Sequence, residues 1–282
     1  NHFNSISMLA NISAINRNFN NAKKLLQKAI KIDPKNMTAI HNLATAYKEL
    51  GKLDDAINYY KKVLEIDPKH TNANFNLGLV FYKLKELKTS KSYLKKAVEI
   101  QSNYAIAFFS LAIVHTDLKE FEDAVSCYQK AIEIKPDLVG AHNNLGLVFR
   151  GLNDFENAIS CYQKTIKIQP DHARAHHNLA QAYKELGEFE KAIKSYQMVT
   201  KYEPDNLTNY YFLSELKKDI LDTSLKGKIE KILTNNQSSK INLAYGNYLL
   251  AKYERKSKNY EKELNYLIKG HLHFFNSDKK KF

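Results

Sequence analysis

A short segment that contains a proline recurs along this chain at a spacing of 34 residues or twice that. Proline has no N–H to donate and disfavours helix in the residue before it, so each proline is expected to end a helix. The prolines are Pro34, Pro68, Pro136, Pro170 and Pro204, and Ser102 stands where a further one would fall. The spacing therefore predicts six equal repeats, which span 3–36, 37–70, 71–104, 105–138, 139–172 and 173–206.

Small residues recur at two positions of each repeat. The seventh position is Leu throughout, and the twenty-fourth is Leu or Tyr. Two helices that cross closely need a small residue on each partner, and large residues then fill the grooves beside the contact. The pattern predicts an all-α fold of helix–turn–helix pairs. The small residues are Ala10, Ala44, Gly78, Ala112, Gly146 and Ala180 at the eighth position, and Ala22, Ala56, Ser90, Ala124, Ala158 and Ala192 at the twentieth.

This order of large, small, aromatic and proline positions resembles the tetratricopeptide repeat (TPR) family. The resemblance covers six successive units in strict register. It implies a right-handed α-solenoid in which the first helix of each pair lines a concave groove, and it implies a protein-binding scaffold with no catalytic role of its own.

After Asn206 the repeat becomes irregular. Residues 207–240 predict a degenerate pair of helices, 207–221 and 223–235, with Asp222 or Thr223 as the N-cap of the second. Residues 241–274 resume a TPR-like form, slipped by about three residues. We expect this last pair to cap the stack, and residues 275–282 to form a tail or linker.

Motifs for catalysis, cofactors and metals are missing from the sequence. There is no GxGxxG, GxxxxGK or GxSxG. His176 and His177 are adjacent and cannot point one way from a helix, and His271-x-His273 suits a strand better than a helix for metal ligation. Cys127 and Cys161 lie at equivalent positions of successive repeats, about 8–10 Å apart, too far for a disulfide. We expect no catalytic, cofactor or metal residues, and free thiols compatible with a reducing, cytoplasmic location.

The formal charge is +13, which raises RNA or an anionic lipid surface as partners. Only four of the 43 basic residues are Arg, however, and base readout and bidentate phosphate contacts depend on Arg. Specific nucleic-acid binding is therefore not predicted, and lysine-driven binding through residues 207–282 stays an alternative. No apolar stretch is long enough to cross a membrane, so membrane insertion is not expected.

Asparagine is frequent at the sixth position of the repeats, although it costs about 0.5 kcal/mol against Ala inside a helix. An amide can donate and accept at once, so it can match a peptide backbone of any sequence. Neighbours at the fifth, ninth and twelfth positions would then select side chains, and open phenylalanines would form an apolar hot spot within 71–138. The predicted groove residues are Asn42, Asn76, Ser110, Asn144, Asn178, His41, Phe75, Phe109, Asn143, His177, Leu79, Tyr82, Arg150 and Lys184.

The asparagine row resembles the amide ladder of the O-GlcNAc transferases, which implies binding to the backbone of an extended polypeptide. The alternative is that these amides bond one another or solvent. A carboxylate clamp of the chaperone-binding kind is broken here, because His41 stands at its first lysine and Ile106 and Ser110 replace its cations.

The end of the chain, from Leu213 onward, resembles the region before the catalytic domain of bacterial TPR-containing sulfotransferases. This implies, as an alternative to a free scaffold, a substrate-recruiting or dimerising arm of a sulfotransferase or a glycosyltransferase, and a homodimer through the repeats is possible. The first residues show neither an initiating Met nor a signal pattern, so we expect a processed product or an excised fragment.

Overall fold

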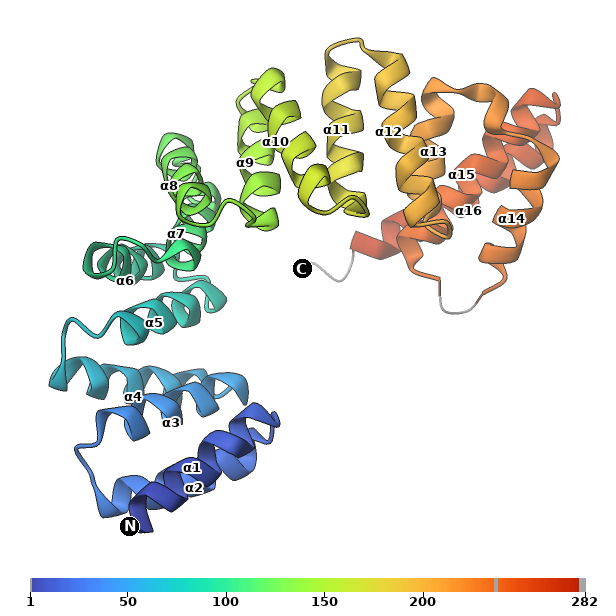
Figure 1. Ribbon diagram of the computed structural model, residues 1–282. Coiled ribbons are helices and arrows are strands. Elements are labelled where there is room, and N and C mark those ends of the chain that lie inside the picture. The colour runs from blue at the N-terminus through green and yellow to red at the C-terminus, as the bar shows by residue number, and fades with distance from the viewer. Residues whose placement is uncertain (1, 236–237, 279–282) are drawn as a thin grey trace. The chain divides into compact units, whose positions relative to one another are not determined.

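The computed structural model describes residues 2–235 and 238–278. In this part of the chain there are sixteen α-helices, one 3-10 helix and no strand. The helices of the repeats form antiparallel pairs (Figure 1), and successive pairs contact one another within residues 1–148 and within residues 149–282. The predicted all-α solenoid of TPR-like pairs is confirmed.

The six predicted repeats correspond to six helix pairs. From 37 onward each first helix begins on the first residue of its repeat. The pairs are α1 (His2–Ile15) and α2 (Phe19–Ile32), α3 (Met37–Glu49) and α4 (Leu53–Ile66), α5 (Thr71–Lys83) and α6 (Leu87–Ile100), α7 (Ala105–Asp117) and α8 (Phe121–Ile134), α9 (Val139–Gly151) and α10 (Phe155–Ile168), and α11 (Ala173–Glu185) and α12 (Phe189–Tyr202).

The turn inside each pair depends on one residue in the left-handed region of the backbone, always at the fifteenth position. Glycine fills it only at Gly51 and Gly187, where φ is 72° and 73°. The other repeats place Arg17, Lys85, Lys119 and Asn153 there, with φ between 55° and 65°. A residue with a Cβ is strained in this conformation, so the packing of the two helices must hold it.

Two compact parts make up the chain, residues 1–148 and 149–282. In the N-terminal part the alanines at the eighth and twentieth positions, such as Ala44 and Ala56, are fully buried where the paired helices cross. Tyr60 and Tyr128, at the twenty-fourth position, are buried beside them. The same pattern recurs in the C-terminal part with Ala180, Ala192 and Tyr196.

Beyond the repeats, the C-terminal part contains α13 (Leu207–Leu216), a 3-10 turn (Lys218–Ile220), α14 (Thr223–Leu233), α15 (Lys240–Lys256) and α16 (Tyr260–Asp278). Asp222 is the N-cap of α14, and its Oδ1 accepts from the Leu225 N–H at 2.7 Å. The predicted helix over 207–221 is wrong in its second half, because Lys217 is extended and ends α13.

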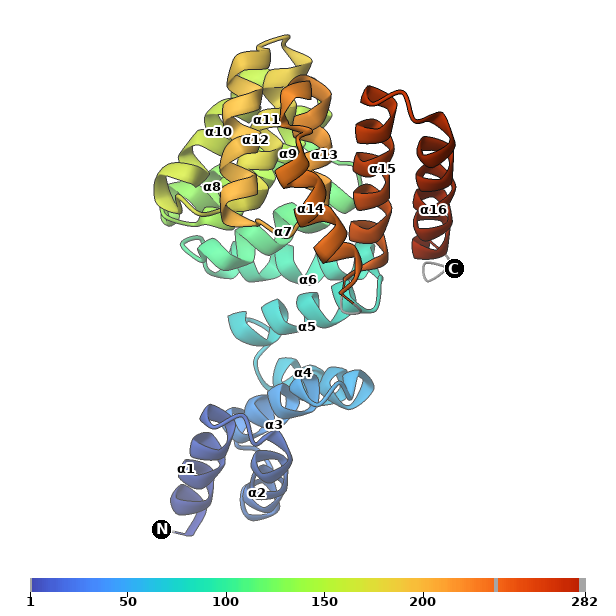
Figure 2. The ribbon, with the colours of Figure 1, turned by 90° about the vertical axis from the view of Figure 1, so that its right-hand side faces the viewer.

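The last pair, α15 and α16, lies at the end of the C-terminal part with α16 outermost (Figure 2). Lys258 repeats the left-handed turn of the regular pairs, with φ of 58°. The expectation of a tail from residue 275 is wrong up to Asp278, since α16 continues through these residues. Residues 279–282 lie outside the described residues.

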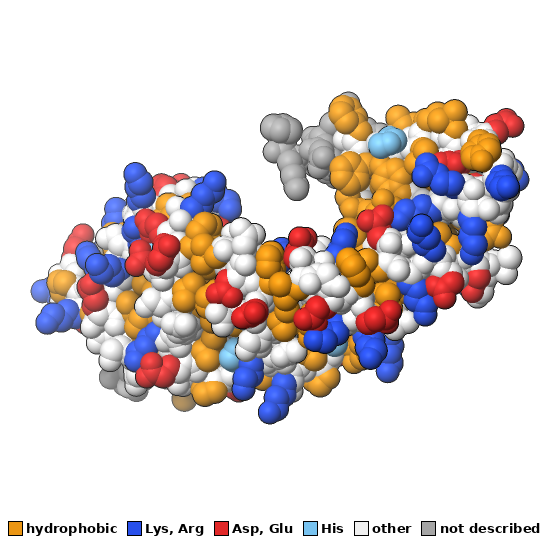
Figure 3. Space-filling model, turned by 90° about the horizontal axis from the view of Figure 1, so that it is seen from above, with side chains coloured by type: hydrophobic (Ala, Val, Ile, Leu, Met, Phe, Trp, Pro, Cys, Tyr) orange, Lys and Arg blue, Asp and Glu red, His pale blue; other side chains and the backbone are white. Residues whose placement is uncertain are grey.

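Lysines and acidic residues are mixed on the face seen in Figure 3, with no large area of one sign. None of the helices in the described ranges is both long enough and apolar enough to cross a membrane.

Candidate functional site

The asparagines at the sixth position hydrogen-bond to the preceding repeat in the N-terminal part of the chain. Asn42 Nδ2 donates to Asn11 Oδ1 at 3.1 Å. Asn76 Oδ1 accepts from Lys48 Nζ at 3.0 Å, and its Nδ2 lies 3.4 Å from His41 Nε2. These amides therefore tie successive first helices together, as in the alternative where amides bond one another. Sequence analysis missed Asn11 because it stands at the ninth position, outside the row.

The rest of the row also has partners within the protein. Asn144 accepts from the neighbouring Asn143 amide at 3.2 Å. Ser110 Oγ donates to the carbonyl of Ile106 in its own helix at 2.8 Å. Asn178 and Asn143 are buried. An open row of amides that faces a ligand is not what the structure places here, and a role of these residues in peptide binding stays a prediction.

Side chains at the fifth position pack against the buried tyrosine at the twenty-fourth position. The ring centroids of His41 and Tyr60 are 5.5 Å apart, those of Phe109 and Tyr128 are 6.0 Å apart, and those of His177 and Tyr196 are 5.6 Å apart. Burial lowers the pKa of His41 and of His177. These rings belong to the packing inside each repeat.

Phe75 does not lie open as predicted. It is only 9 % exposed, because Tyr104 packs against it with the ring centroids 5.0 Å apart. Phe109 is half-buried, and its ring would lie 3.2 Å from a Cβ added to Gly140. The prediction of an open Phe75 is therefore wrong, because the chain itself covers it, and Phe109 is covered in part. Leu79 also packs into this core.

The twelfth position bridges to the next helix pair. Tyr82 donates to Asp117 at 2.8 Å, and Arg150 Nη1 donates to Gln181 Oε1 at 2.6 Å. Lys184 Nζ lies 4.0 Å from a carboxylate oxygen of Glu215. Lys48, Tyr82, Arg150 and Lys184 thus contact the next first helix, whereas Thr116, at the same position, donates to the Ala112 carbonyl of its own helix at 2.8 Å.

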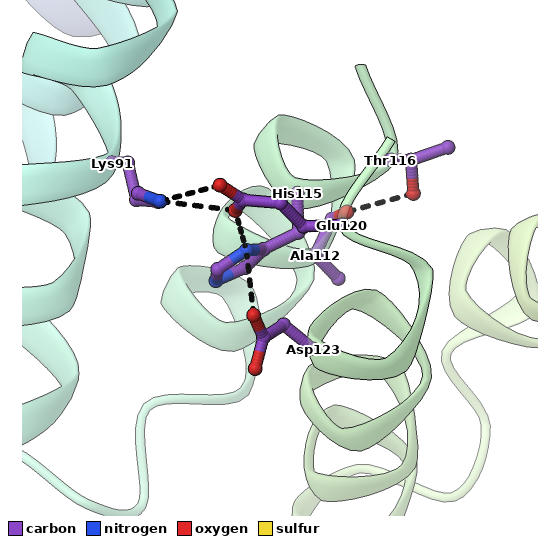
Figure 4. Close-up of polar contacts among 6 residues, drawn as sticks. All are labelled: Lys91, Ala112, His115, Thr116, Glu120 and Asp123. Atoms are coloured by element: carbon purple, nitrogen blue, oxygen red, sulfur yellow. Dashed lines mark hydrogen bonds and ion pairs between the residues drawn. The ribbon is translucent and has the colours of Figure 1, made fainter. Parts of the chain in front are cut away.

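A charged cluster that sequence analysis missed lies where α6 meets the turn between α7 and α8 (Figure 4). His115 Nδ1 lies 2.6 Å from Glu120 Oε2, and Lys91 Nζ donates to both oxygens of Glu120 at 2.7 and 3.0 Å. The Lys91 ammonium, followed by His115, lowers the pKa of Glu120. No motif in the sequence marks this cluster.

The same cluster offers metal-ligand atoms, because His115, Glu120 and Asp123 each have one within 4.8 Å of the others. Lys91 Nζ already donates a hydrogen bond to each carboxylate oxygen of Glu120, however, and Asp123 is exposed. An ammonium at this position neutralises the carboxylate that a cation would need. The arrangement fits an ion-pair network that joins neighbouring repeats.

A polar cleft of about 570 Å³ opens in the C-terminal part, where α11, α13 and α15 begin. Val199 and Ile241 give it an apolar element, and Arg174, Glu203 and Asp205 line it with charge. His177 is the one predicted groove residue that lines it; Ala173, Asn206, Thr208, Asn209, Ser239 and Asn242 complete the lining.

Most amides of this cleft are held by the protein. Asn242 Oδ1 accepts from the Leu207 N–H at 2.6 Å, and Asn242 Nδ2 donates to the Asp205 carbonyl at 2.9 Å. Asn209 Nδ2 donates to Glu203 at 3.1 Å. Arg174 is exposed and has no ion pair among the described residues. These hydrogen bonds hold the amide side chains of the cleft in place, and Arg174 is its available cation.

The two cysteines are free. Burial raises the pKa of each thiol, of Cys127 and of Cys161, to about 11. Near neutral pH both are therefore protonated and poor nucleophiles.

Models of the tetratricopeptide repeat match residues 4–36, 25–58, 44–85, 71–104, 114–152 and 137–202. The chain belongs to the tetratricopeptide repeat family. No curated protein matches it.

Solved structures of repeat proteins are similar to this chain. MamA is 28 % identical, with a TM-score of 0.57 over 60 % of this chain and 93 % of its own. YrrB, described as a TPR protein with an unusual peptide-binding site, is 22 % identical, with a TM-score of 0.59 over 66 % and 96 %. PilF of Pseudomonas aeruginosa is 19 % identical, with a TM-score of 0.65 over 76 % and 97 %. These likenesses support the repeat fold of the chain.

Proposed function

We propose that this protein is a non-catalytic scaffold that binds an extended polypeptide, and that the bound segment enters the cleft at the start of α11, α13 and α15. The observation that carries the proposal is the cleft itself, a hollow of about 570 Å³ where α11, α13 and α15 begin. The family and the peptide-binding site named for YrrB support the class of ligand.

The lining of the cleft suits a polypeptide. A peptide presents polar backbone groups together with side chains of both kinds, so its site needs donors, acceptors and apolar surface together. Arg174 supplies a cation, Asp205 an acceptor, and Ile241 an exposed apolar contact. The internal hydrogen bonds of Asn209 and Asn242 fix the walls before the ligand arrives, which lowers the entropic cost of binding.

The predicted asparagine row has a different part in this proposal. Asn42 and Asn76 hold successive first helices in register. Their substitution is expected to weaken the stack first and ligand binding only as a consequence. The cleft and the row can therefore be separated by experiment.

A peptide array probed with the full chain tests the proposal. We expect a subset of peptides to bind, and we expect Arg174→Glu and Thr208→Trp to abolish that binding, the first by reversing the charge and the second by filling the cleft. Lys164→Glu is the matched control for Arg174→Glu, because it also replaces a positive side chain with a negative one, at an exposed position of α10. Melting curves show whether each variant is folded. Peptides that bind folded Arg174→Glu and Thr208→Trp as well as they bind the original chain would refute the cleft as the site.

The transferase arm and the binding of RNA or anionic lipid stay predictions. The solved structures that resemble this chain are repeat proteins, and the face seen in Figure 3 carries lysines and acidic residues together.

A further inference from the structure

The last helix, α16, exposes a row of large apolar side chains. Tyr260, Leu264, Ile268 and Leu272 are 67, 59, 49 and 58 % exposed. A spacing of four residues places them on one ridge of the helix. The opposite side of α16 is closely packed, because a Cβ added to Gly270 would lie 2.5 Å from the Tyr248 ring. The row is therefore the free side of a helix that is firmly held on its other side.

At two of the four ridge positions, those of Ile268 and Leu272, the other second helices carry polar residues, whereas at the positions of Tyr260 and Leu264 most of them carry apolar residues. The Glu263 N–H donates to the Asn259 carbonyl as the Ala56 N–H does to Lys52, which aligns α16 with the regular repeats. In this alignment Ile268 replaces Gln27, Lys61, Lys95, Gln129, Gln163 and Gln197, and Leu272 replaces Lys31, Glu65, Glu99, Glu133, Lys167 and Lys201.

This substitution of apolar for polar residues falls on the final helix described. A continuous apolar ridge on a surface marks an interaction site.

We propose that this ridge, formed by Tyr260, Leu264, Ile268 and Leu272, is the interface of a homodimer in which the α16 helices of two copies cross antiparallel. The spacing is self-complementary: with the two-fold axis at Tyr266, Tyr260 of one copy faces Leu272 of the other, and Leu264 faces Ile268. Ridges of residues four apart interdigitate in the commonest mode of helix packing, at a crossing angle of about −50°.

The charges beside the ridge select the antiparallel direction and the second copy as occupant. Glu261 lies at the start of α16, and Lys269 and His271 lie toward its end; all three are exposed. Antiparallel crossing brings Glu261 of each copy toward Lys269 and His271 of the other, whereas parallel crossing would oppose Glu261 to itself. The other exposed apolar face, on α1 with Met8 and Ile12, has no acidic residue and no lysine or arginine with which to complement α16.

One ridge is smaller than the roughly 800 Å² that each partner buries in a typical stable interface. We therefore expect a dimer with a dissociation constant of about 1–100 μM. Sedimentation velocity of the full chain between about 1 and 200 μM should show a monomer–dimer equilibrium that ends at the dimer. Growth into longer assemblies would contradict the two-fold interface.

Substitutions distinguish this interface from nonspecific hydrophobic association. Ile268→Lys with Leu272→Glu restores the polarity of the regular repeats and should give a monomer at all these concentrations. Ile66→Lys, which removes an exposed apolar residue from α4, and Ile12→Lys on α1 are the controls and should leave the dimer intact. Loss of the dimer in Ile12→Lys, or its survival in Ile268→Lys with Leu272→Glu, would overturn the proposal.

A charge exchange tests the antiparallel direction. Glu261→Lys and Lys269→Glu should each weaken the dimer by about tenfold, because each places like charges together across the interface. The double variant should restore the original dissociation constant to within about a factor of two. A double variant that is weaker than either single variant would rule out the antiparallel pairing.

Discussion

Ser90 Oγ donates a hydrogen bond to the carbonyl of Gly78 at 2.8 Å, across the contact between α5 and α6. These are the twentieth and eighth positions of the third repeat, so the two small positions meet in space. In the other repeats of the N-terminal part the same contact is made by two alanines, as by Ala44 and Ala56. The hydrogen bond satisfies the hydroxyl that Ser90 buries where the others bury a methyl group.

The closeness of this contact predicts a cost for Gly78→Ala. A Cβ at this position would lie 2.5 Å from Leu94 Cγ, so Leu94 must shift within a buried core. We expect a loss of about 1–3 kcal/mol in the free energy of unfolding, measured by urea denaturation. Gly227→Ala in α14 is the control, because nothing lies within 4 Å of the added Cβ, and it should stabilise the protein by up to about 1 kcal/mol. Equal effects of the two variants would show that the third repeat is not packed this closely.

Two tyrosines at the twenty-fourth position differ in one hydrogen bond. The Tyr60 hydroxyl lies 2.9 Å from Thr45 Oγ1, whereas the buried Tyr162 hydroxyl has no hydrogen-bond partner in the described part of the chain. Tyr60→Phe should therefore lower the free energy of unfolding by about 1 kcal/mol, and Tyr162→Phe should leave it unchanged or raise it by about 1 kcal/mol. Denaturation curves of the two variants provide the comparison, and a loss in Tyr162→Phe as large as that in Tyr60→Phe would contradict it.

The repeat itself could be predicted from the sequence because it depends on short-range rules. Small residues at two positions and a proline at the end of each repeat indicate where helices cross and stop, and the helices from α3 to α12 follow that frame. The burial of Phe75 could not be predicted in this way, because the ring is covered by Tyr104, the residue just before the first helix of the next repeat. Periodicity assigns a residue to a side of its helix, but it does not say what the neighbouring repeat places over that side.

The candidate site could be predicted only in part for the same reason. His177 lines the cleft as a groove residue should, but the cleft depends on α13 and α15, which follow the irregular 207–240 segment. The contact of Asn42 with Asn11 joins the sixth position of one repeat to the ninth of another, and the angle between repeats decides which positions meet. The apolar ridge of α16 was not predicted, since only Ile268 and Leu272 stand at positions that are polar in the regular repeats.

Because burial lowers the pKa of His41 and of His177, we expect acid to destabilise the protein. Burial is the main reason that the pKa of His41 and of His177 is lowered from the ordinary value of about 6.5, so the folded state holds each histidine neutral while the unfolded state takes up a proton below that value. Because the pKa of each histidine is lower in the folded state than in the unfolded state, its contribution to the free energy of unfolding is complete above about pH 6.5 and falls as the pH drops below that value.

Phenylalanine occupies the same position in the third and fourth repeats, at Phe75 and Phe109, so His41→Phe with His177→Phe is a matched replacement. The free energy of unfolding of the original chain should fall between pH 7.5 and 5.5 by more than that of the double variant, with a difference of up to about 1.4 kcal/mol for each histidine. All other histidines are common to the two proteins. The same pH dependence in both proteins would mean that these rings are not held neutral by their burial beside Tyr60 and Tyr196.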